Sequence, residues 1–215
     1  MNTNIKPFYI YTDKNSLYIK NINENTEKLA SNIHSYSANI DDDNNIHILG
    51  IDNFGKIIHF FNNEGIWKKK IIRKCFNSVR NIKDMRLYIL NDYFNVFVVE
   101  KYPLDDNLYK ISHLNFNISN YNMFRHTIDK VFKDSSSIYK LNIDELSNII
   151  FQYKTIDILS RNICDNVIIF NNISRKWITS TPLLRSNQIS LNEKNISSNI
   201  KSDIFEYCYS IKYKL

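Results

Sequence analysis

The chain has 215 residues, of which 43% are hydrophobic and 13% aromatic, and it contains only 3 Gly and 3 Pro. This composition excludes a disordered chain and leaves no segment typical of a flexible or stiff interdomain linker. The net charge of +6 is compatible with an acidic partner, although a codon bias towards lysine explains it nearly as well. We therefore expect one compact domain over residues 1–215.

The chain start lacks a charged head followed by an apolar stretch, and no run approaches the ~18 apolar residues of a membrane helix. Cys75, Cys164 and Cys208 are widely spaced and form no CxxC pair, which favours reduced thiols over a disulfide or metal framework. These features predict a cytoplasmic protein with no transmembrane segment and no cofactor.

Strand-like runs rich in Ile, Val, Tyr and Phe, bounded by Asn, Asp or Gly, follow one another along the chain. In chain order they form groups of three runs in residues 8–33 and of four runs each in residues 35–72, 85–128 and 137–184. One last run covers residues 204–215. Helical periodicity is weak throughout, so short helices are allowed only around residues 77–84 and 187–202.

The groups in residues 35–72 and 137–184 repeat one order of features. In both, the first run ends in Asp, as YSANID at Asp41 and YKLNID at Asp144, and the fourth opens on Trp67 or Trp177. The group between them is a looser copy with Asp92 at the position of the first Asp.

Repeated four-stranded antiparallel meanders predict an all-β fold, a small β-propeller with four blades preferred and five possible. The N-terminal group has three runs, so we expect residues 204–215 to supply its innermost strand and to close the ring. A β-sandwich is less favoured because it does not explain a repeated order with complementary incomplete ends.

The stretch YSANIDDDNNIHILGIDNFGK, with the aromatic-rich strand and WKKK that follow, resembles uncharacterised β-propeller proteins of clostridia and related AT-rich Gram-positive bacteria. The resemblance extends over nearly all of residues 8–184 and is clearest in residues 36–72. It implies a propeller fold, and it carries no agreed activity and no catalytic residue.

Asp41, Asp92 and Asp144 are the candidate carboxylates. Equivalent positions of a propeller converge at one end of the central channel, which is an arrangement that a glycosidase can use. Turn formation explains repeated Asp equally without catalysis, and it is also favoured over calcium binding for DDDNN at residues 41–45.

His47 and His59 are expected to approach each other across the meander of residues 35–72, in a hydrogen-bonding role rather than as metal ligands. The basic stretch WKKKIIRK at residues 67–74 either binds phosphates or prevents edge-to-edge aggregation of the outermost strand of a blade. The second interpretation is favoured. Packing within a blade is likewise favoured over sugar binding for the two tryptophans.

These patterns favour a non-catalytic binding or interaction module, not an enzyme, with a protein as the first expected ligand and a carbohydrate as the second. The alternatives are a glycoside-active enzyme with carboxylates around the central channel and, less favoured, a nucleic-acid binder with a basic face. No metal site is expected. The candidate ligand-binding residues are Asp41, Asp92, Asp144, Trp67 and Trp177.

Overall fold

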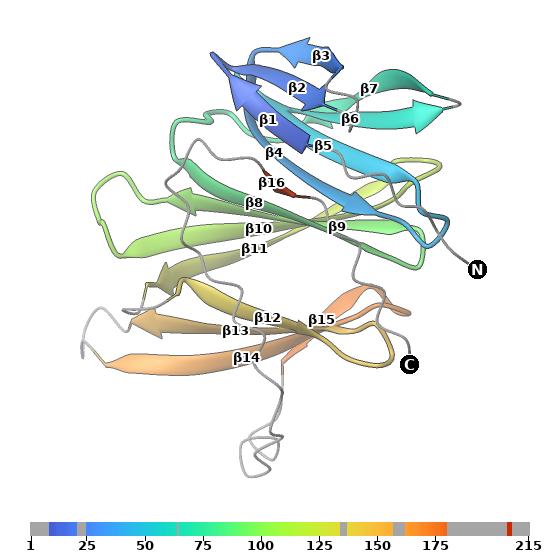
Figure 1. Ribbon diagram of the computed structural model, residues 1–215. Coiled ribbons are helices and arrows are strands. Elements are labelled where there is room, and N and C mark those ends of the chain that lie inside the picture. The colour runs from blue at the N-terminus through green and yellow to red at the C-terminus, as the bar shows by residue number, and fades with distance from the viewer. Residues whose placement is uncertain are drawn as a thin grey trace. The chain divides into compact units, whose positions relative to one another are not determined.

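The computed structural model describes residues 9–20, 25–63, 65–133, 137–156 and 162–179, together with the backbone of Glu206–Tyr207. This part of the chain contains strands and turns and no helix, so the predicted all-β class is confirmed (Figure 1). Among these residues there is, accordingly, no helix that is long and apolar enough to cross a membrane.

The strands form antiparallel meanders in chain order. The first sheet has the order β16-β1-β2-β3 and the second the order β4-β5-β6-β7. The bounds are β1 Tyr9–Asp13, β2 Ser16–Lys20, β3 Thr26–Ser31, β4 Ile33–Ile40, β5 Ile46–Asp52, β6 Lys56–Asn63, β7 Ile66–Lys74 and β16 Glu206–Tyr207.

The third sheet joins two further meanders in the order β15-β14-β13-β11-β10-β9-β8, with β12 also paired to β13. β11 reaches β13 only through Val131 opposite Thr155 and Phe132 opposite Lys154, beyond the end of the β12 ladder. The bounds are β8 Ile82–Leu90, β9 Tyr93–Lys101, β10 Leu108–Asn117, β11 Met123–Phe132, β12 Tyr139–Ile143, β13 Ile149–Ile156, β14 Ile163–Asn171 and β15 Lys176–Thr179.

The contacts divide the chain into two units. The first comprises Met1–Val98, His113–Arg125 and Lys201–Leu215, and the second comprises Val99–Ser112 and His126–Ile200. The division falls within β9, β10 and β11, and the residues of the candidate site all belong to the first unit.

Within the first unit, β5 is buried along its whole length and sends alternate side chains to two separate cores, as the period-2 geometry of a strand requires. Ile46 and Ile48 pack with Ile10 and Leu17 of the first sheet. The opposite face joins a core with β8, β9 and β10, formed in part by Leu49, Ile51, Met85, Leu87, Phe94, Val96, Leu114 and Phe116. The inner strand β5 of the second sheet is therefore covered by protein on both faces.

The strands that open two successive meanders, β4 and β8, are held together by side chains of β4. The Leu87 amide donates to Ser37 Oγ at 3.0 Å, and Asn39 Nδ2 donates to the Leu87 carbonyl at 3.0 Å. Both bonds satisfy main-chain groups that would otherwise lie at a strand edge.

The turn between β5 and β6 contains a glycine that cannot be replaced without a collision. Gly55 has φ of 79°, and a Cβ built on it would lie 1.9 Å from the carbonyl oxygen of Phe76. Its own carbonyl accepts the amides of Cys75 at 2.9 Å and Phe76 at 3.1 Å. The chain leaving β7 is thus fastened to this turn by main-chain atoms.

One detail differs from the sequence-based expectations, and another is not tested. A short helix around residues 77–84 is wrong, because β8 begins at Ile82 and extended backbone carries Ile82 and Met85 into the buried core. The second allowed helix, at 187–202, lies outside the described residues, as do most of residues 204–215. From that terminal segment the structure describes the pairing of Tyr207 with Tyr9 and of Glu206 with Ile10.

Candidate functional site: a carboxylate, two histidines and a tyrosine

The site starts from the turn that joins β4 to β5, where Asp41 organises the backbone. Its Oδ1 accepts the amides of Asp43 at 3.0 Å and Asn45 at 2.7 Å, and its Oδ2 accepts Asn45 Nδ2 at 3.0 Å. Asn44, three residues after Asp41, has φ of 66°, a conformation that Asn tolerates better than most residues. Asp and Asn at these positions therefore account for the turn by local hydrogen bonding.

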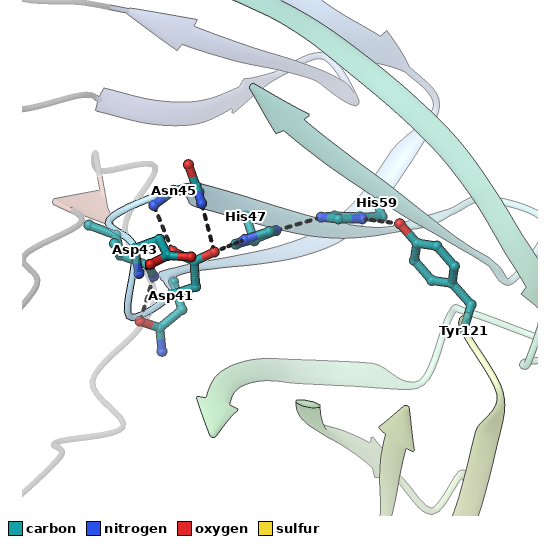
Figure 2. Close-up of polar contacts among 8 residues, drawn as sticks. Asp41, Asp43, Asn45, His47, His59 and Tyr121 are labelled. Carbon is teal, nitrogen blue, oxygen red and sulfur yellow. Dashed lines mark hydrogen bonds and ion pairs between the residues drawn. The ribbon is translucent and has the colours of Figure 1, made fainter. Parts of the chain in front are cut away.

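Behind this turn, four side chains form a continuous series of hydrogen bonds, which Figure 2 shows from Asp41 to Tyr121. Asp41 Oδ2 lies 3.0 Å from His47 Nε2, His47 Nδ1 lies 2.9 Å from His59 Nε2, and His59 Nδ1 lies 2.8 Å from Tyr121 Oη. The residues come from the β4–β5 turn, β5, β6 and the β10–β11 turn. We refer to them as the Asp41–Tyr121 series.

The middle of the series is buried and its two ends are partly exposed. His47 is 5% exposed and His59 is 1% exposed, whereas Asp41 and Tyr121 are intermediate. The Phe94 ring meets both imidazoles edge-on, at centroid distances of 5.3 Å and 4.9 Å. The two imidazoles thus lie against one apolar side chain and away from solvent. Proton exchange with solvent is therefore easiest at Asp41 and Tyr121, the two ends of the series.

Burial and charge set the protonation of the series. Burial by itself raises the pKa of the Asp41 carboxyl, but hydrogen bonds from His47 and Asn45 outweigh it and hold the pKa below its usual value. Burial, followed by the charges of His47 and Lys70, lowers the pKa of His59 to about 3. Burial also raises the pKa of Tyr121. At neutral pH the series therefore has an ionised carboxylate, a neutral His59 and a neutral phenol.

Lys70 of β7 stands beside the outer end of the series, with its Nζ 4.2 Å from the centroid of the Tyr121 ring. This is a cation–π contact, and it keeps a positive charge next to the phenol. β7 is an edge strand of its sheet, and Lys68, Lys69 and Lys70 are exposed on it, as expected for lysines that protect an edge.

A second copy of the turn lies between β12 and β13. Asp144 Oδ1 accepts the amides of Leu146 at 2.9 Å and Asn148 at 2.8 Å, its Oδ2 accepts Asn148 Nδ2 at 3.0 Å, and Ser147 has φ of 61°. By the strand registers, Ile150 and Val167 occupy the positions of His47 and His59. The turn is therefore repeated, and the histidines are not.

Asp92 occupies a different kind of turn. It follows Asn91 in the connection between β8 and β9, and both residues have positive φ, 49° and 62°. The Asp92 carbonyl accepts the Ile118 amide at 3.0 Å. Asp92 thus belongs to a two-residue hairpin connection, and its side chain has no counterpart to the Asp41 hydrogen bonds within the described residues.

The two tryptophans hold equivalent positions in their meanders, Trp67 opposite Asn62 and Trp177 opposite Phe170. Trp67 packs against the core shared by the first and second sheets. Trp177 contacts His126, Phe151 and Phe170 at centroid distances of 5.6, 6.0 and 5.4 Å. Both rings are partly buried, and each also contacts residues of a neighbouring meander.

The sequence predicted the approach of His47 and His59 and missed Tyr121. Tyr121 lies 62 residues after His59 in a turn, so no spacing in the sequence connects the two. In the described part of the chain, no group of three or more His, Cys, Asp or Glu side chains is arranged to hold a metal ion.

No protein-family model matches the chain, and no curated protein is similar to it in sequence. Three similar solved structures are a GH43 endo-arabinanase from Bacillus licheniformis, an exo-1,5-alpha-L-arabinanase from a bovine ruminal metagenomic library and an alpha-L-arabinanase from Cellvibrio cellulosa. Their identities are 12%, 10% and 11%, with TM-scores of 0.43, 0.43 and 0.37. The matches cover 79%, 81% and 82% of this chain and 71%, 73% and 77% of those chains.

These structures correct two predictions made from the sequence, that the chain is a non-catalytic binding module and that it is not an enzyme. Neither prediction is supported by this comparison, since the three structures are named as arabinanases, which are the enzymes of the stated alternative. The low identity and low TM-scores transfer neither a substrate nor a catalytic residue to this chain.

Proposed function

We propose that the chain is a glycoside-active enzyme and that Tyr121 is its substrate-facing acid. The observation that carries this proposal is the Asp41–Tyr121 series, three consecutive hydrogen bonds of 2.8–3.0 Å from an ionised carboxylate to a partly exposed phenol. A nucleophile or acid held by a base that is itself oriented by a third group is typical of acid–base sites.

The proposed step is protonation of the leaving oxygen. When His47 carries a second proton, it gives its Nδ1 proton to His59 Nε2, His59 gives its Nδ1 proton to Tyr121 Oη, and Tyr121 gives its own proton to the glycosidic oxygen. The C–O bond to that oxygen breaks, and water supplies a hydroxyl to the sugar carbon and a proton that restores His47. No charge is left on Tyr121, which suits a phenol whose pKa is raised by burial.

Asp41 has an anchoring role in this proposal rather than the role of acid. Its carboxylate accepts four hydrogen bonds, and its pKa is held below the usual value, so it stays ionised and stabilises the charged form of His47. Contact of Asp92, Asp144, Trp67 and Trp177 with a ligand stays a proposal, as does a cytoplasmic location.

The test is an assay of the full chain for release of reducing ends from arabinan and from a panel of other polysaccharides, between pH 4 and pH 8. We expect activity on at least one polysaccharide and a loss of at least tenfold in kcat for Tyr121→Phe, which keeps the ring and removes the proton. Tyr18→Phe makes the same change at another partly exposed tyrosine, on β2, and as the matched control it should keep wild-type kcat. Absence of release from every polysaccharide by folded protein, or full activity of Tyr121→Phe, overturns the proposal.

We further propose that the meanders are blades of a β-propeller, four in number, closed by the C-terminal strand on the N-terminal blade. The proposal is supported by the sheet order β16-β1-β2-β3, by burial of both faces of β5 and by the bonds from β4 to β8. Deleting residues 204–215 should lower the midpoint of thermal unfolding sharply and promote aggregation, because it exposes the edge of β1. An unchanged midpoint would speak against closure.

A further inference from the structure

The hydrogen atoms of the Asp41–Tyr121 series can be placed from its chemistry. An ionised carboxylate only accepts, so His47 Nε2 carries the proton of the first bond. A neutral His47 then has an unprotonated Nδ1, which must accept from His59 Nε2. A neutral His59 has an unprotonated Nδ1, which must accept from Tyr121 Oη. In this resting state every proton points toward Asp41.

One added proton permits a second complete arrangement. If His47 holds protons on both nitrogens, its Nδ1 donates to His59 Nε2, and His59 must carry its single proton on Nδ1, which donates to Tyr121 Oη. All three hydrogen bonds are kept, and two of them are reversed. In this loaded state the Tyr121 proton is free to point outward.

The surroundings decide which histidine holds the added proton. His47 lies 3.0 Å from the Asp41 carboxylate, so a proton added to His47 is next to a negative charge. His59 is next to Lys70 and has no carboxylate partner among the described residues, and its pKa lies near 3. Among the described residues, the titratable and charged groups around the pair are Asp41 of the β4–β5 turn, Lys70 of β7 and Tyr121 of the β10–β11 turn, and β9 contributes the uncharged Phe94.

We infer that the Asp41–Tyr121 series is a one-proton switch, in which a proton added to His47 changes the tautomer of His59. As a result Tyr121 Oη, which otherwise accepts a hydrogen bond from a ligand, donates one to it. In the resting state the site accepts from a ligand hydroxyl, and in the loaded state it donates to an ether or glycosidic oxygen. The inference rests on the proposed function for its ligand, whereas the switch itself needs no ligand.

The experiment is two-bond nitrogen–proton correlation NMR on the full chain with nitrogen-15 histidine, recorded without substrate from pH 8 downward. The signals of His47 and His59 are assigned with single His→Gln variants. At pH 8 we expect both histidines to be Nε2–H tautomers. As the pH falls, His47 should become doubly protonated while His59 changes to the Nδ1–H tautomer in the same transition.

Two variants sharpen the experiment. Asp41→Asn removes the negative charge beside His47 and should lower the midpoint of the transition by at least one pH unit. Asp144→Asn changes the same turn where no histidine follows, and it should leave the midpoint unchanged. A His59 that remains an Nε2–H tautomer, a transition that is the same in Asp41→Asn, or unfolding before any tautomer change overturns the inference.

The outcomes separate the switch from the proposed function. A tautomer change with no glycoside hydrolysis keeps the switch and removes the enzyme proposal. Hydrolysis that depends on Tyr121 with a fixed His59 tautomer removes the switch and keeps the enzyme proposal.

Discussion

In the Asp41 turn the carboxylate continues inward to two buried histidines, whereas behind the Asp144 turn the equivalent positions are Ile150 and Val167. Both turns use the same acceptor atoms for the same backbone amides, and both place a residue with positive φ three positions after the Asp. The hydrogen bonds within the turn account for the presence of Asp in both copies. They do not explain why two imidazoles replace aliphatic side chains in the first copy, at a cost in desolvation.

The largest expected effect comes from removing the two carboxylates one at a time. Asp41→Ala should lower the free energy of unfolding by about 3 kcal/mol, because it removes turn bonds and leaves His47 Nε2–H buried without its acceptor. Asp144→Ala removes turn bonds only and should cost about 1 kcal/mol. Urea unfolding followed by tryptophan fluorescence measures both, and equal losses would show that the histidines add nothing to the role of Asp41.

The next largest loss of stability is expected when the two histidines behind the Asp41 turn are replaced by the residues found behind the Asp144 turn. His47→Ile and His59→Val alone should each cost about 2 kcal/mol, because each leaves a buried nitrogen of the other histidine unpaired. The double variant carries the residues of the second copy and should be within about 1 kcal/mol of the wild type. The double-mutant cycle is measured by urea unfolding, and additive losses would contradict a paired role.

Lowering the pH should reduce the stability of the wild type more than that of the double variant, which lacks the two histidines. The pKa of His59 falls from 6.5 to about 3 in the folded protein, so between these values the unfolded chain binds a proton that the folded chain does not. The contribution is complete above pH 6.5 and is lost as the pH falls, by up to about 1.4 kcal/mol per unit. Asp41 acts in the same direction only below its usual value of 3.8. Urea unfolding at pH 7, 6, 5 and 4 should show a flatter dependence in the double variant.

The smallest effect is expected at the outer end of the series. Tyr121→Phe keeps the ring and its contact with Lys70, and it removes one hydrogen bond at a partly exposed position, so the cost should be about 1 kcal/mol or less. A loss above 2 kcal/mol in the same urea measurement would assign Tyr121 a mainly structural role.

The strands and their antiparallel order could be predicted from the sequence because period-2 patterns and Asn, Asp and Gly turns are local signals. That the last run adds a strand to the N-terminal group could be predicted for a different reason, since three runs at one end and one at the other are complementary. The pairing of Tyr207 with Tyr9 agrees with this, and its register could not be predicted. The equivalence of Asp92 with Asp41 is only approximate, because a two-residue turn with positive φ at Asn91 and Asp92 replaces the longer turn.

The site was less accessible to prediction than the fold. His47 and His59 lie on neighbouring strands of one hairpin, so their approach follows from register. Tyr121 reaches His59 from the turn after β10, and that contact depends on how a later meander packs against β5 and β6. Sequence patterns report which face of a strand is apolar, and they do not report which side chain of another sheet meets it.

The Gly55 turn has a consequence for how this chain can vary. The atoms that meet there are main-chain atoms of Gly55, Cys75 and Phe76, so the identities of the side chains at 75 and 76 do not enter the contact. Substitutions at positions 75 and 76 therefore leave this main-chain contact unchanged, and what limits them is the core in which the Phe76 side chain is buried. Position 55 admits glycine alone, so the course of the chain after β7 depends on the backbone of that one residue.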